Sequence, residues 1–238
     1  MVRLPEKIPG QRQPQLSIVV PVLDEAEQLD TFLTSLVERL PEETEVLVVD
    51  GGSKDNSVGI VKQHPVKLIS SARGRALQMN AGARQALGTY LMFLHADTML
   101  PRDFKSEFEW WIQSQPIWGF APVRLLGEDW WCRLVEGGIN LRTRITAGAS
   151  GDQAQIVQSK YFSALGGFAE IQLMEDIELS YRLRRLWPAR RFRLPVTTSS
   201  RRWQRGGVVR TVLLMWFLRS SYRLGVSPVR LARWYAGA

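Results

Sequence analysis

Polar side chains that are able to do chemistry follow three predicted strands of the chain. Each strand is a short apolar run of the kind found in buried parallel sheets, at residues 17–22, 46–49 and 89–94. The polar residues directly after these runs are Asp24 with Glu25, Asp50, and His95 with Asp97. Carboxylates and an imidazole can hold a divalent cation or take up a proton. In open α/β sheets the ligand lies outside the carboxyl ends of the strands, so we expect these groups to line one site.

A second acidic pair, Glu175 and Asp176, begins a predicted amphipathic helix that ends before Pro188. The positive end of a helix dipole stabilises carboxylates in the first turn, which is one explanation for the pair. The other explanation is catalytic, because a carboxylate in a partly desolvated pocket can accept a proton from a hydroxyl group. The pair is therefore the second candidate for a site.

Helices and further strands must position these groups. The apolar spacing predicts helices that begin near Asp24, which we expect to cap the first of them, near Asp55 and at Arg75. Strands that alternate with helices predict an α/β fold with a Rossmann-like, mostly parallel sheet flanked by helices. The remaining predicted elements are a strand at 66–69, a helix at 104–112, a strand at 118–125 and helices at 128–145 and 161–167. Neither a P-loop nor a G-x-G-x-x-G fingerprint is present, so the sequence gives no support to those nucleotide sites.

Charge is distributed unevenly along the 238 residues. The net charge is +8, yet the chain has no Asp or Glu after Glu178, and the same C-terminal part carries 14 Arg and no Lys. This asymmetry indicates an anionic partner, such as a diphosphate, an anionic lipid or a nucleic acid. The alternative is a solvated basic face with ion pairs to the acidic part.

The composition excludes several classes of protein. A hydrophobic fraction of 45% with abundant aromatics excludes disorder, and the single cysteine, Cys132, excludes a disulfide scaffold. We therefore expect a reducing, cytoplasmic compartment. Residues 1–15 lack the apolar core of a signal peptide, and no apolar run reaches the roughly 18 residues of a membrane span.

Four motifs in this order resemble those of the family 2 glycosyltransferases. They are Ser17-Ile-Val-Val-Pro-Val-Leu-Asp-Glu25, Val48-Val-Asp50-Gly-Gly-Ser, Phe93-Leu-His95-Ala-Asp97 and Glu175-Asp176. The resemblance covers roughly residues 16–190, and Ser200-Arg-Arg-Trp203 adds a similarity to the small bacterial branch of the arsenosugar-biosynthesis type. It implies a GT-A fold, a nucleotide-sugar donor with UDP expected, a divalent Mn²⁺ or Mg²⁺, and inverting transfer to an acceptor hydroxyl.

The resemblance also implies roles for individual residues. Asp176 matches the catalytic base, and Glu175 beside it is expected to raise the pKa of that base by repulsion. Asp97 matches the second Asp of the family's D-x-D motif, which binds the metal ion that contacts the donor diphosphate. The residues expected around the nucleotide sugar are Pro21, Val22, Leu23, Glu25, Asp50, Arg73, Asn80, His95 and Ala96. Further candidates for contacts with the acceptor or the diphosphate are Asp152, Gln153, Arg202 and Trp203.

Two positions depart from the family pattern. His95 stands where the family has the first Asp of its D-x-D motif, and Gly51 stands where it has the second Asp of V-D-D-G-S. Imidazole is an acceptable ligand for Mn²⁺ and a poorer one for Mg²⁺. His95 is therefore expected either to ligate the metal weakly or to orient the donor phosphates.

We expect a GT-A domain over residues 1–194, with a nucleotide half at about 16–100 and an acceptor half at about 101–194. A basic helical extension would follow over 195–238. Its apolar stretch, Thr211–Leu218, is too short to span a bilayer and is flanked by Arg on both sides. Such a stretch either packs on the domain, lies on the inner face of an anionic membrane near a lipid-linked acceptor, or forms a homodimer contact.

Other function classes stay open on the residues alone. A nucleotidyltransferase has a similar sheet and similar metal carboxylates, but its Gly- and Arg-rich loop after the first strand is absent. A binding protein without catalysis, for nucleic acid or another anion, would use the Arg and Trp residues of the tail, although no nucleic-acid-binding motif supports it.

Overall fold

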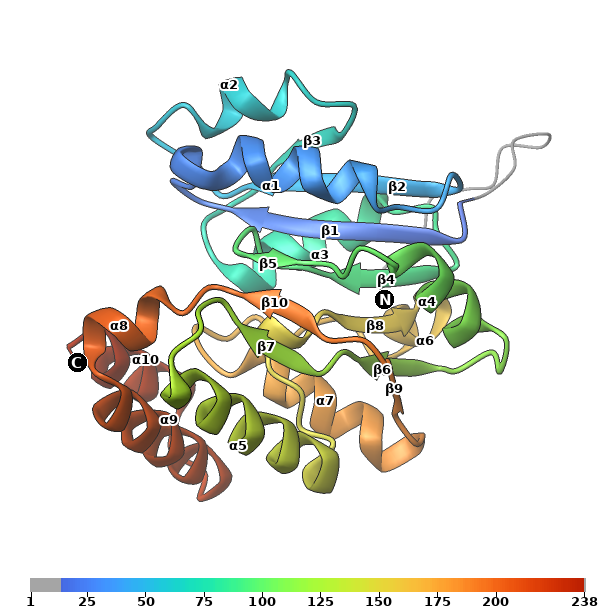
Figure 1. Cartoon of the computed structure of the whole chain (residues 1–238). Coiled ribbons are helices and arrows are strands. Elements are labelled where there is room, and N and C mark those ends of the chain that lie inside the picture. Colours follow the sequence, from blue (N-terminus) through green and yellow to red (C-terminus); the bar gives the residue numbers. More distant parts are fainter. Residues whose placement is uncertain (1–13, 238) are drawn as a thin grey trace.

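The computed structural model describes residues 14–237, and within this range the side chains of Arg202 and Arg205 are not described. Most of the polar N-terminal stretch therefore lies outside the described residues. Two sheets and their flanking helices make up the described part (Figure 1). Among these residues, none of the helices has the length and hydropathy needed to cross a bilayer.

The larger sheet has seven strands in the order β3-β2-β1-β4-β8-β6-β9. Its first four strands are parallel: β1 (Leu16–Val22), β2 (Thr44–Asp50), β3 (Lys67–Ser70) and β4 (Tyr90–Phe93). The strand β8 (Gln155–Gln158) runs antiparallel to both β4 and β6 (Trp118–Phe120), and β9 (Arg190–Arg191) pairs with β6 in parallel. The predicted α/β fold with a mostly parallel sheet is confirmed.

The continuous apolar run of β1 has a structural cause, because both of its faces are covered. Ile18 and Val20 pack with the helix α1 (Ala26–Glu38), while Val19 lies in the second core with α3 (Arg75–Gln85). The short helix α2 (Ser57–Val61) connects β2 to β3. This half places the carboxyl ends of β1, β2 and β4 side by side.

The second half carries the smaller sheet and the remaining helices. The small sheet has the order β5-β10-β7, with β5 (Thr98–Met99), β7 (Val123–Leu125) and β10 (Val196–Thr198). The helices and the one 3₁₀ turn of this half are α4 (Phe104–Ile112), α5 (Trp130–Thr146), η1 (Gly151–Gln153), α6 (Ser159–Ala164) and α7 (Glu175–Leu186). The strand β10 places residues 196–198 inside a sheet, so the helical part of the tail begins after them.

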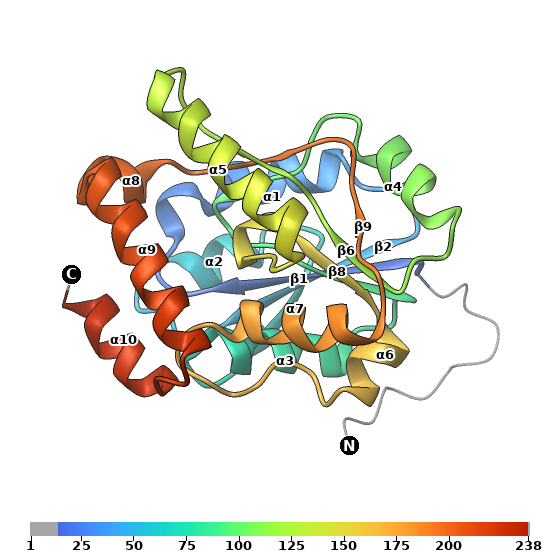
Figure 2. The same ribbon diagram turned by 90° about the horizontal axis from the view of Figure 1, so that it is seen from below.

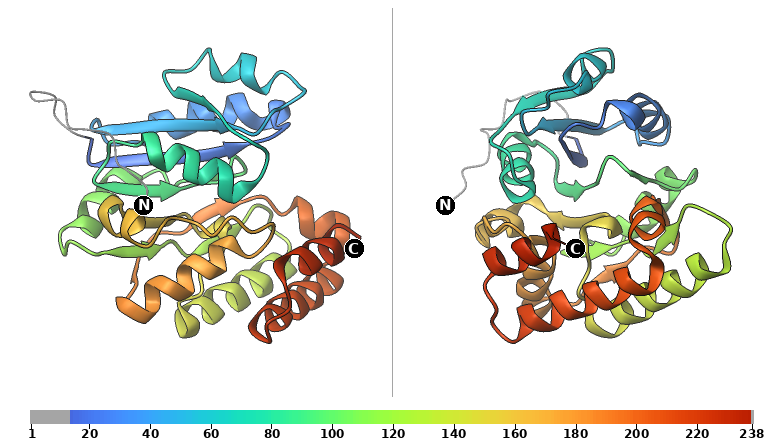
Figure 3. Two further views of the ribbon diagram at one scale, coloured as in Figure 1. Left: turned by 180° about the vertical axis from the view of Figure 1, so that it is seen from behind. Right: turned by 90° about the vertical axis from the view of Figure 1, so that its left-hand side faces the viewer.

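The tail forms three helices, α8 (Arg201–Gly206), α9 (Val208–Arg223) and α10 (Pro228–Ala236). Leu218 of α9 and Leu231 of α10 pack against Met174 and Ile177 at the start of α7. Val208 and Val212 pack against α5. Packing on the domain, one of the alternatives for the tail, is thus present, and Figure 3 shows these helices beside α5 at one end of the molecule.

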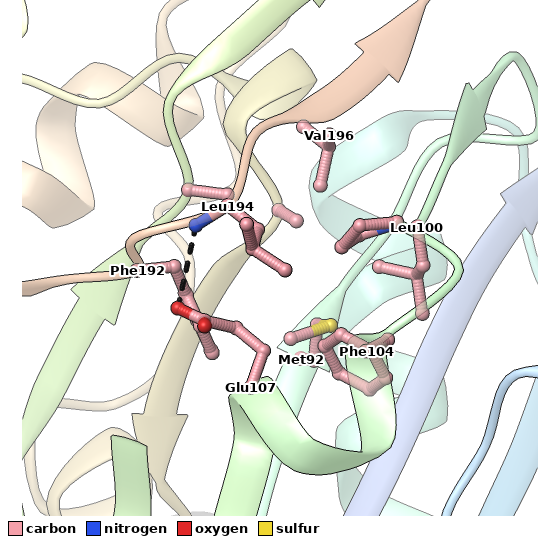
Figure 4. Close-up of a pocket in the computed structure, with 10 residues that line it drawn as sticks. Met92, Leu100, Phe104, Glu107, Phe192, Leu194 and Val196 are labelled. Carbon is pink, nitrogen blue, oxygen red and sulfur yellow. Dashed lines mark hydrogen bonds between the residues drawn. The ribbon is translucent and has the colours of Figure 1, made fainter. Parts of the chain in front are cut away.

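A small cavity between α4 and the segment around Leu194 belongs to the core (Figure 4). Its lining is apolar apart from Glu107, which is 1% exposed. The Glu107 carboxylate accepts hydrogen bonds from the backbone N–H groups of Arg193 and Leu194 and forms an ion pair of 3.0 Å with the Arg193 side chain. A buried carboxylate with these partners holds the chain after β9 in place.

Gly119 of β6 tests this arrangement of strands. A Cβ atom there would overlap the backbone carbonyl of Arg190 on β9 and lie 2.9 Å from the Trp111 ring. We expect Gly119→Ala to lower the free energy of unfolding by about 2 kcal/mol or more. The matched control is Gly137→Ala in α5, where a Cβ meets nothing within 4 Å. That change is expected to stabilise the protein by about 0.5–1 kcal/mol. Equilibrium urea unfolding measures both, and wild-type stability of Gly119→Ala would contradict the pairing of β6 with β9.

Candidate active site

The carboxyl ends of β2, β1 and β4 form the floor of the candidate site, because these three strands are neighbours in the sheet. Leu23, Asp24 and Glu25 follow β1, and Asp50 ends β2. His95, Ala96 and Asp97 follow β4. The predicted convergence of these groups at one edge is present, with Asp24 and Asp97 exposed, Glu25 and His95 half-buried and Asp50 buried.

Hydrogen bonds between two segments fix the loop after β1. Asp24 has φ 54°, in the left-handed region, and its Oδ1 accepts a hydrogen bond of 2.6 Å from the N–H of Lys54. The Oδ2 of Asp55 accepts from the N–H of Ala26 at 2.9 Å. Asp55 therefore satisfies the first turn of α1, and the expectation that Asp24 caps this helix was wrong. Asp24 instead ties the loop to the turn after β2.

Asp50 is 7% exposed and folds its own turn. Its Oδ2 accepts from the N–H of Gly52 at 3.0 Å, and its Oδ1 accepts from the N–H of Ser53 at 3.1 Å. The N–H of Ser53 also lies 3.3 Å from Oδ2, so Oδ2 has two partners and Oδ1 keeps a lone pair for a ligand. The prediction that Asp50 contacts the nucleoside stays a prediction.

A buried glutamine accounts for the glycine at position 51. The Nε2 of Gln78 donates hydrogen bonds of 2.8 Å to the carbonyls of Val22 and Val49, and so joins the ends of β1 and β2. A Cβ on Gly51 would lie 2.9 Å from Cδ and Oε1 of Gln78. An aspartate in place of Gly51 would therefore have to displace this amide. The role of Gln78 could not be predicted from the sequence, because a polar residue inside a predicted helix carries no signal of its own.

Two arginines that the sequence analysis also missed contribute to the charge of the site. Burial raises the pKa of Glu25, the hydrogen bond from Gln28 lowers it, and nearby Asp97 raises it again. Arg75, at the start of α3, and Arg201, at the start of α8, both lower this pKa. Arg201 also donates a hydrogen bond of 3.1 Å to the Oε1 of Gln28, so α8 reaches α1 across the site. Both arginines are brought here by tertiary packing.

The catalytic candidate Asp176 is held by the loop that precedes β8. Its Oδ2 accepts a hydrogen bond of 2.6 Å from the N–H of Gly151. A Cβ on Gly151 would lie 2.5 Å from Cε1 and 2.6 Å from Nε2 of His95, and 3.5 Å from the same Asp176 oxygen. His95 and Asp176 therefore flank one glycine, which joins the end of β4 to the start of α7.

Glu175 beside it is 5% exposed. Burial raises its pKa to about 7, the charge of Asp176 adds to the increase, and Arg75 opposes it. The residue before the pair, Met174, has φ 75°, a conformation that is strained for a side chain of this size. The expected repulsion between the two carboxyl groups is thus present, but the raised pKa is that of Glu175.

Other candidates lie elsewhere. Asn80 is buried and exchanges two hydrogen bonds of 2.9 Å with the backbone of Phe168, so it supports that loop and not the segment around Arg73. Gln153 is fully buried, and its Oε1 accepts from Thr143. Trp203 packs in an apolar cluster with α5. Asn80 and Gln153 are thus occupied by contacts within the protein, Trp203 is half-buried and Arg73 is exposed, while the side chain of Arg202 lies outside the described part. The ligand contacts of these residues stay predictions.

Asp152 differs from Gln153, because one of its carboxylate oxygens has no hydrogen-bond partner in the described part of the protein. This oxygen, Oδ1, is buried. Burial lowers the pKa of Arg142 to about 10, and the charge of Asp152 opposes this decrease. Asp152 therefore stays a candidate for contact with a ligand.

The metal expectation rests on His95 and Asp97. Within residues 14–237 the structure contains no group of three or more His, Cys, Asp and Glu side chains arranged for a metal ion. Mg²⁺ and related ions are often bound by one or two carboxylates together with substrate phosphates. The exposed Asp97 with the nearby His95 fits an ion that arrives with a diphosphate and does not fit a complete protein cage.

Comparison with known proteins supports one family. Residues 17–131 match the family model described as glycosyl transferase family 2. The poly-beta-1,6-N-acetyl-D-glucosamine synthase of Staphylococcus epidermidis is 31% identical over 94 residues, which are 37% of this chain and 23% of that protein. The chain thus spans about a quarter of the length of this relative.

Two solved structures share the fold. That of S. aureus TarS 1–349 with UDP-GlcNAc has a TM-score of 0.62 at 17% identity and covers 78% of this chain and 58% of that one. That of the mannosyltransferase PcManGT from Pyrobaculum calidifontis with GDP-Man and Mn²⁺ has a TM-score of 0.55 at 19% identity, with 79% and 57% covered. The predicted GT-A fold is confirmed, and the finer similarity to the arsenosugar-type branch stays a prediction.

The raised pKa of Glu175 predicts a pH dependence of stability. In the unfolded chain this carboxyl group has its ordinary pKa of 4.5, whereas in the folded protein its pKa is about 7. The folded state therefore binds more protons in this window, and stability falls as the pH rises from 5 to 8. We expect a loss on the order of 1–3 kcal/mol for wild type that Glu175→Gln abolishes. Urea unfolding across this range measures it, and parallel curves for the two proteins would contradict the assignment.

Proposed function

We propose that this chain, whose residues 17–131 match the glycosyl transferase family 2 model, moves a sugar from a nucleoside diphosphate donor to an acceptor hydroxyl, with inversion at the sugar carbon. The observation that carries the proposal is the placement of Asp176. Its carboxylate accepts a hydrogen bond of 2.6 Å from the N–H of Gly151 and lies across that glycine from His95, which follows β4 together with Asp97.

The donor is proposed to lie over the ends of β1, β2 and β4. Pro21, Val22, Leu23 and Ala96 would line the pocket, with the Asp50 and Glu25 carboxylates toward the nucleoside and Arg73 or Arg75 toward the phosphates. UDP is the proposed nucleotide, which is supported by the UDP-GlcNAc in the TarS structure, while GDP-Man in PcManGT keeps GDP as the alternative. In this proposal residues 16–100 hold the donor and residues 101–194 face the acceptor.

Asp97, with His95 beside it, would hold the divalent cation. A bound Mn²⁺ or Mg²⁺ supplies charge compensation for the departing diphosphate. Arg75 and Arg201 add positive charge at the same edge, since both lower the pKa of Glu25 there. These side chains thus bind and orient the leaving group.

Asp176 is proposed to accept the proton of the acceptor hydroxyl as the oxygen attacks the sugar carbon. Burial raises the pKa of Glu175 to about 7, so below that pH Glu175 keeps its proton and adds no second negative charge beside Asp176. The start of α7 and the N–H of Gly151 stabilise this carboxylate. The arrangement favours a single, oriented base.

We place the reaction in the cytoplasm, as the buried free thiol of Cys132 suits a reducing compartment. The basic tail would then meet the inner face of the membrane. A hydroxyl acceptor on a lipid carrier is the corresponding proposal for the second substrate.

The proposal is tested by the product released from a panel of nucleotide sugars with Mn²⁺ or Mg²⁺. A glycosyltransferase releases nucleoside diphosphate. Pyrophosphate release from a nucleoside triphosphate and a sugar phosphate would instead indicate a nucleotidyltransferase. Donor binding without release of either product would indicate a protein that has lost catalysis.

Asp176→Asn tests the base. We expect the variant to keep its fold and its donor-induced thermal shift and to lose transfer by at least about 100-fold, because the amide cannot accept the proton. Asp103→Asn, an exposed change of the same kind at the start of α4, is the matched control and should retain activity. Wild-type turnover of Asp176→Asn would mean that another residue is the base, and Glu175 would be the next candidate.

Asp97→Ala tests the metal. Donor binding measured by calorimetry should lose its dependence on the divalent cation, whereas His95→Ala should weaken binding less. His95→Asp is expected to shift preference from Mn²⁺ toward Mg²⁺, because a carboxylate suits the harder ion. Equal affinity of the wild type for the donor with and without chelator would refute the role of Asp97.

A further inference from the structure

Two helices of the second half expose apolar side chains along one side. On α5 the exposed residues are Trp130, Leu134, Leu141 and Ile145, and on α9 they are Val209, Leu213, Trp216 and Phe217. Steps of three, four and seven residues place each set on one helix face. Trp130 is 77% exposed and Trp216 is 68% exposed, so these are large apolar surfaces in contact with water. Patches of this kind mark sites of interaction.

The helices α5 and α9 lie on one side of the molecule (Figure 2). Cys132 and Val135 of α5 pack in one cluster with Val208 and Val212 of α9. The exposed residues lie on the other sides of these helices, and both helices are in front when the molecule is seen from below (Figure 2). Val209, Leu213 and Phe217 also line a shallow groove on α9 with Arg210 and Leu214.

Arginines border both faces. Arg133 and Arg144 are exposed on α5, and Arg210 and Arg223 are exposed on α9. The neighbouring α10 adds Arg230 and Arg233, both exposed. On α5, Arg133 forms an ion pair with Glu136, and the exposed Glu128 and Asp129 precede Trp130. The sequences of α9 and α10 contain arginines and no acidic residue, so the basic character is strongest on the α9 side. An apolar centre with Trp and Phe and a basic border is the composition of a surface that lies in the plane of an anionic membrane.

We infer that the outer faces of α5 and α9 together form a docking surface for a bilayer that contains anionic phospholipid. The aromatic and aliphatic side chains would enter the boundary between headgroups and acyl chains, and the arginines would contact lipid phosphates. Docking does not depend on the proposed function. Only its consequence, an acceptor presented by the same membrane, rests on that function.

A second copy of this chain fits the surface less well. A symmetric contact would bring the basic borders of two copies together, and like charges at an interface oppose association. Nucleic acid would pair with the arginines but would leave Leu134, Leu141, Ile145 and Leu213 without an apolar partner. The combination of both chemistries is what favours lipid.

The experiment is sedimentation of the full chain with vesicles of phosphatidylcholine, with and without phosphatidylglycerol. We expect binding to the vesicles with phosphatidylglycerol and little to phosphatidylcholine alone. Leu134→Ser on α5 and Leu213→Ser on α9 should each weaken binding by about threefold or more, because each change removes a leucine side chain that would enter the bilayer. Leu87→Ser, the same change at an exposed leucine outside both helices, is the control and should bind as wild type.

Tryptophan quenching locates the contact. Vesicles with brominated acyl chains should quench a component of the fluorescence that Trp130→Phe and Trp216→Phe each reduce. Sedimentation velocity without lipid shows whether the wild type is a monomer, and release of nucleoside diphosphate from the donor without vesicles is expected to be the same for all variants.

Three results would overturn the inference. The first is absence of binding to phosphatidylglycerol vesicles at low salt. The second is binding that Leu134→Ser and Leu213→Ser leave unchanged, which would mean adsorption by charge alone. The third is a wild-type dimer that these two substitutions convert to monomers. Loss of binding for Leu213→Ser but not for Leu134→Ser would remove α5 from the surface. Failure of all sugar donors would refute the proposed function and leave the vesicle result standing.

Discussion

The hydrogen bond from the N–H of Gly151 to the Asp176 carboxylate is the contact on which the rest of the site depends. It joins the turn before β8 to the first turn of α7, and the missing side chain of Gly151 is what leaves room for the His95 ring. Two segments from the second half and one strand end from the first half thereby meet at a single backbone position. The orientation of the carboxylate follows from main-chain geometry, which is more rigid than a contact between two side chains.

Both departures from the family motifs become intelligible from their neighbours. Gly51 faces the buried amide of Gln78, which holds the ends of β1 and β2 by their carbonyls, so a carboxylate has no room there. His95 lies against Gly151, where an imidazole ring fills the space that the glycine leaves. Each unusual residue is thus matched by a second one that is distant in sequence.

The strands, the polar residues that follow them and the acidic pair at the start of α7 could be predicted because these signals are local in the sequence. Apolar runs with polar ends reveal β1, β2 and β4 without any knowledge of partners. Gln153 and Asn80 could not be placed in this way, since their burial comes from Thr143 and Phe168, whose positions depend on tertiary packing. Arg75 and Arg201 were missed for the same reason, because nothing in their neighbourhood in the sequence points toward Glu25.

The packing of the tail on α7 has a thermodynamic consequence. Leu218 of α9 lies against Met174 and Ile177, which flank the acidic pair. Arg201 of α8 donates a hydrogen bond to Gln28 of α1, on the other side of the candidate site. Any ligand of the tail that favours one placement of α8 and α9 therefore favours one shape of the crevice. Since such coupling is reciprocal, occupancy of the crevice must change the affinity of the tail for that ligand by the same factor.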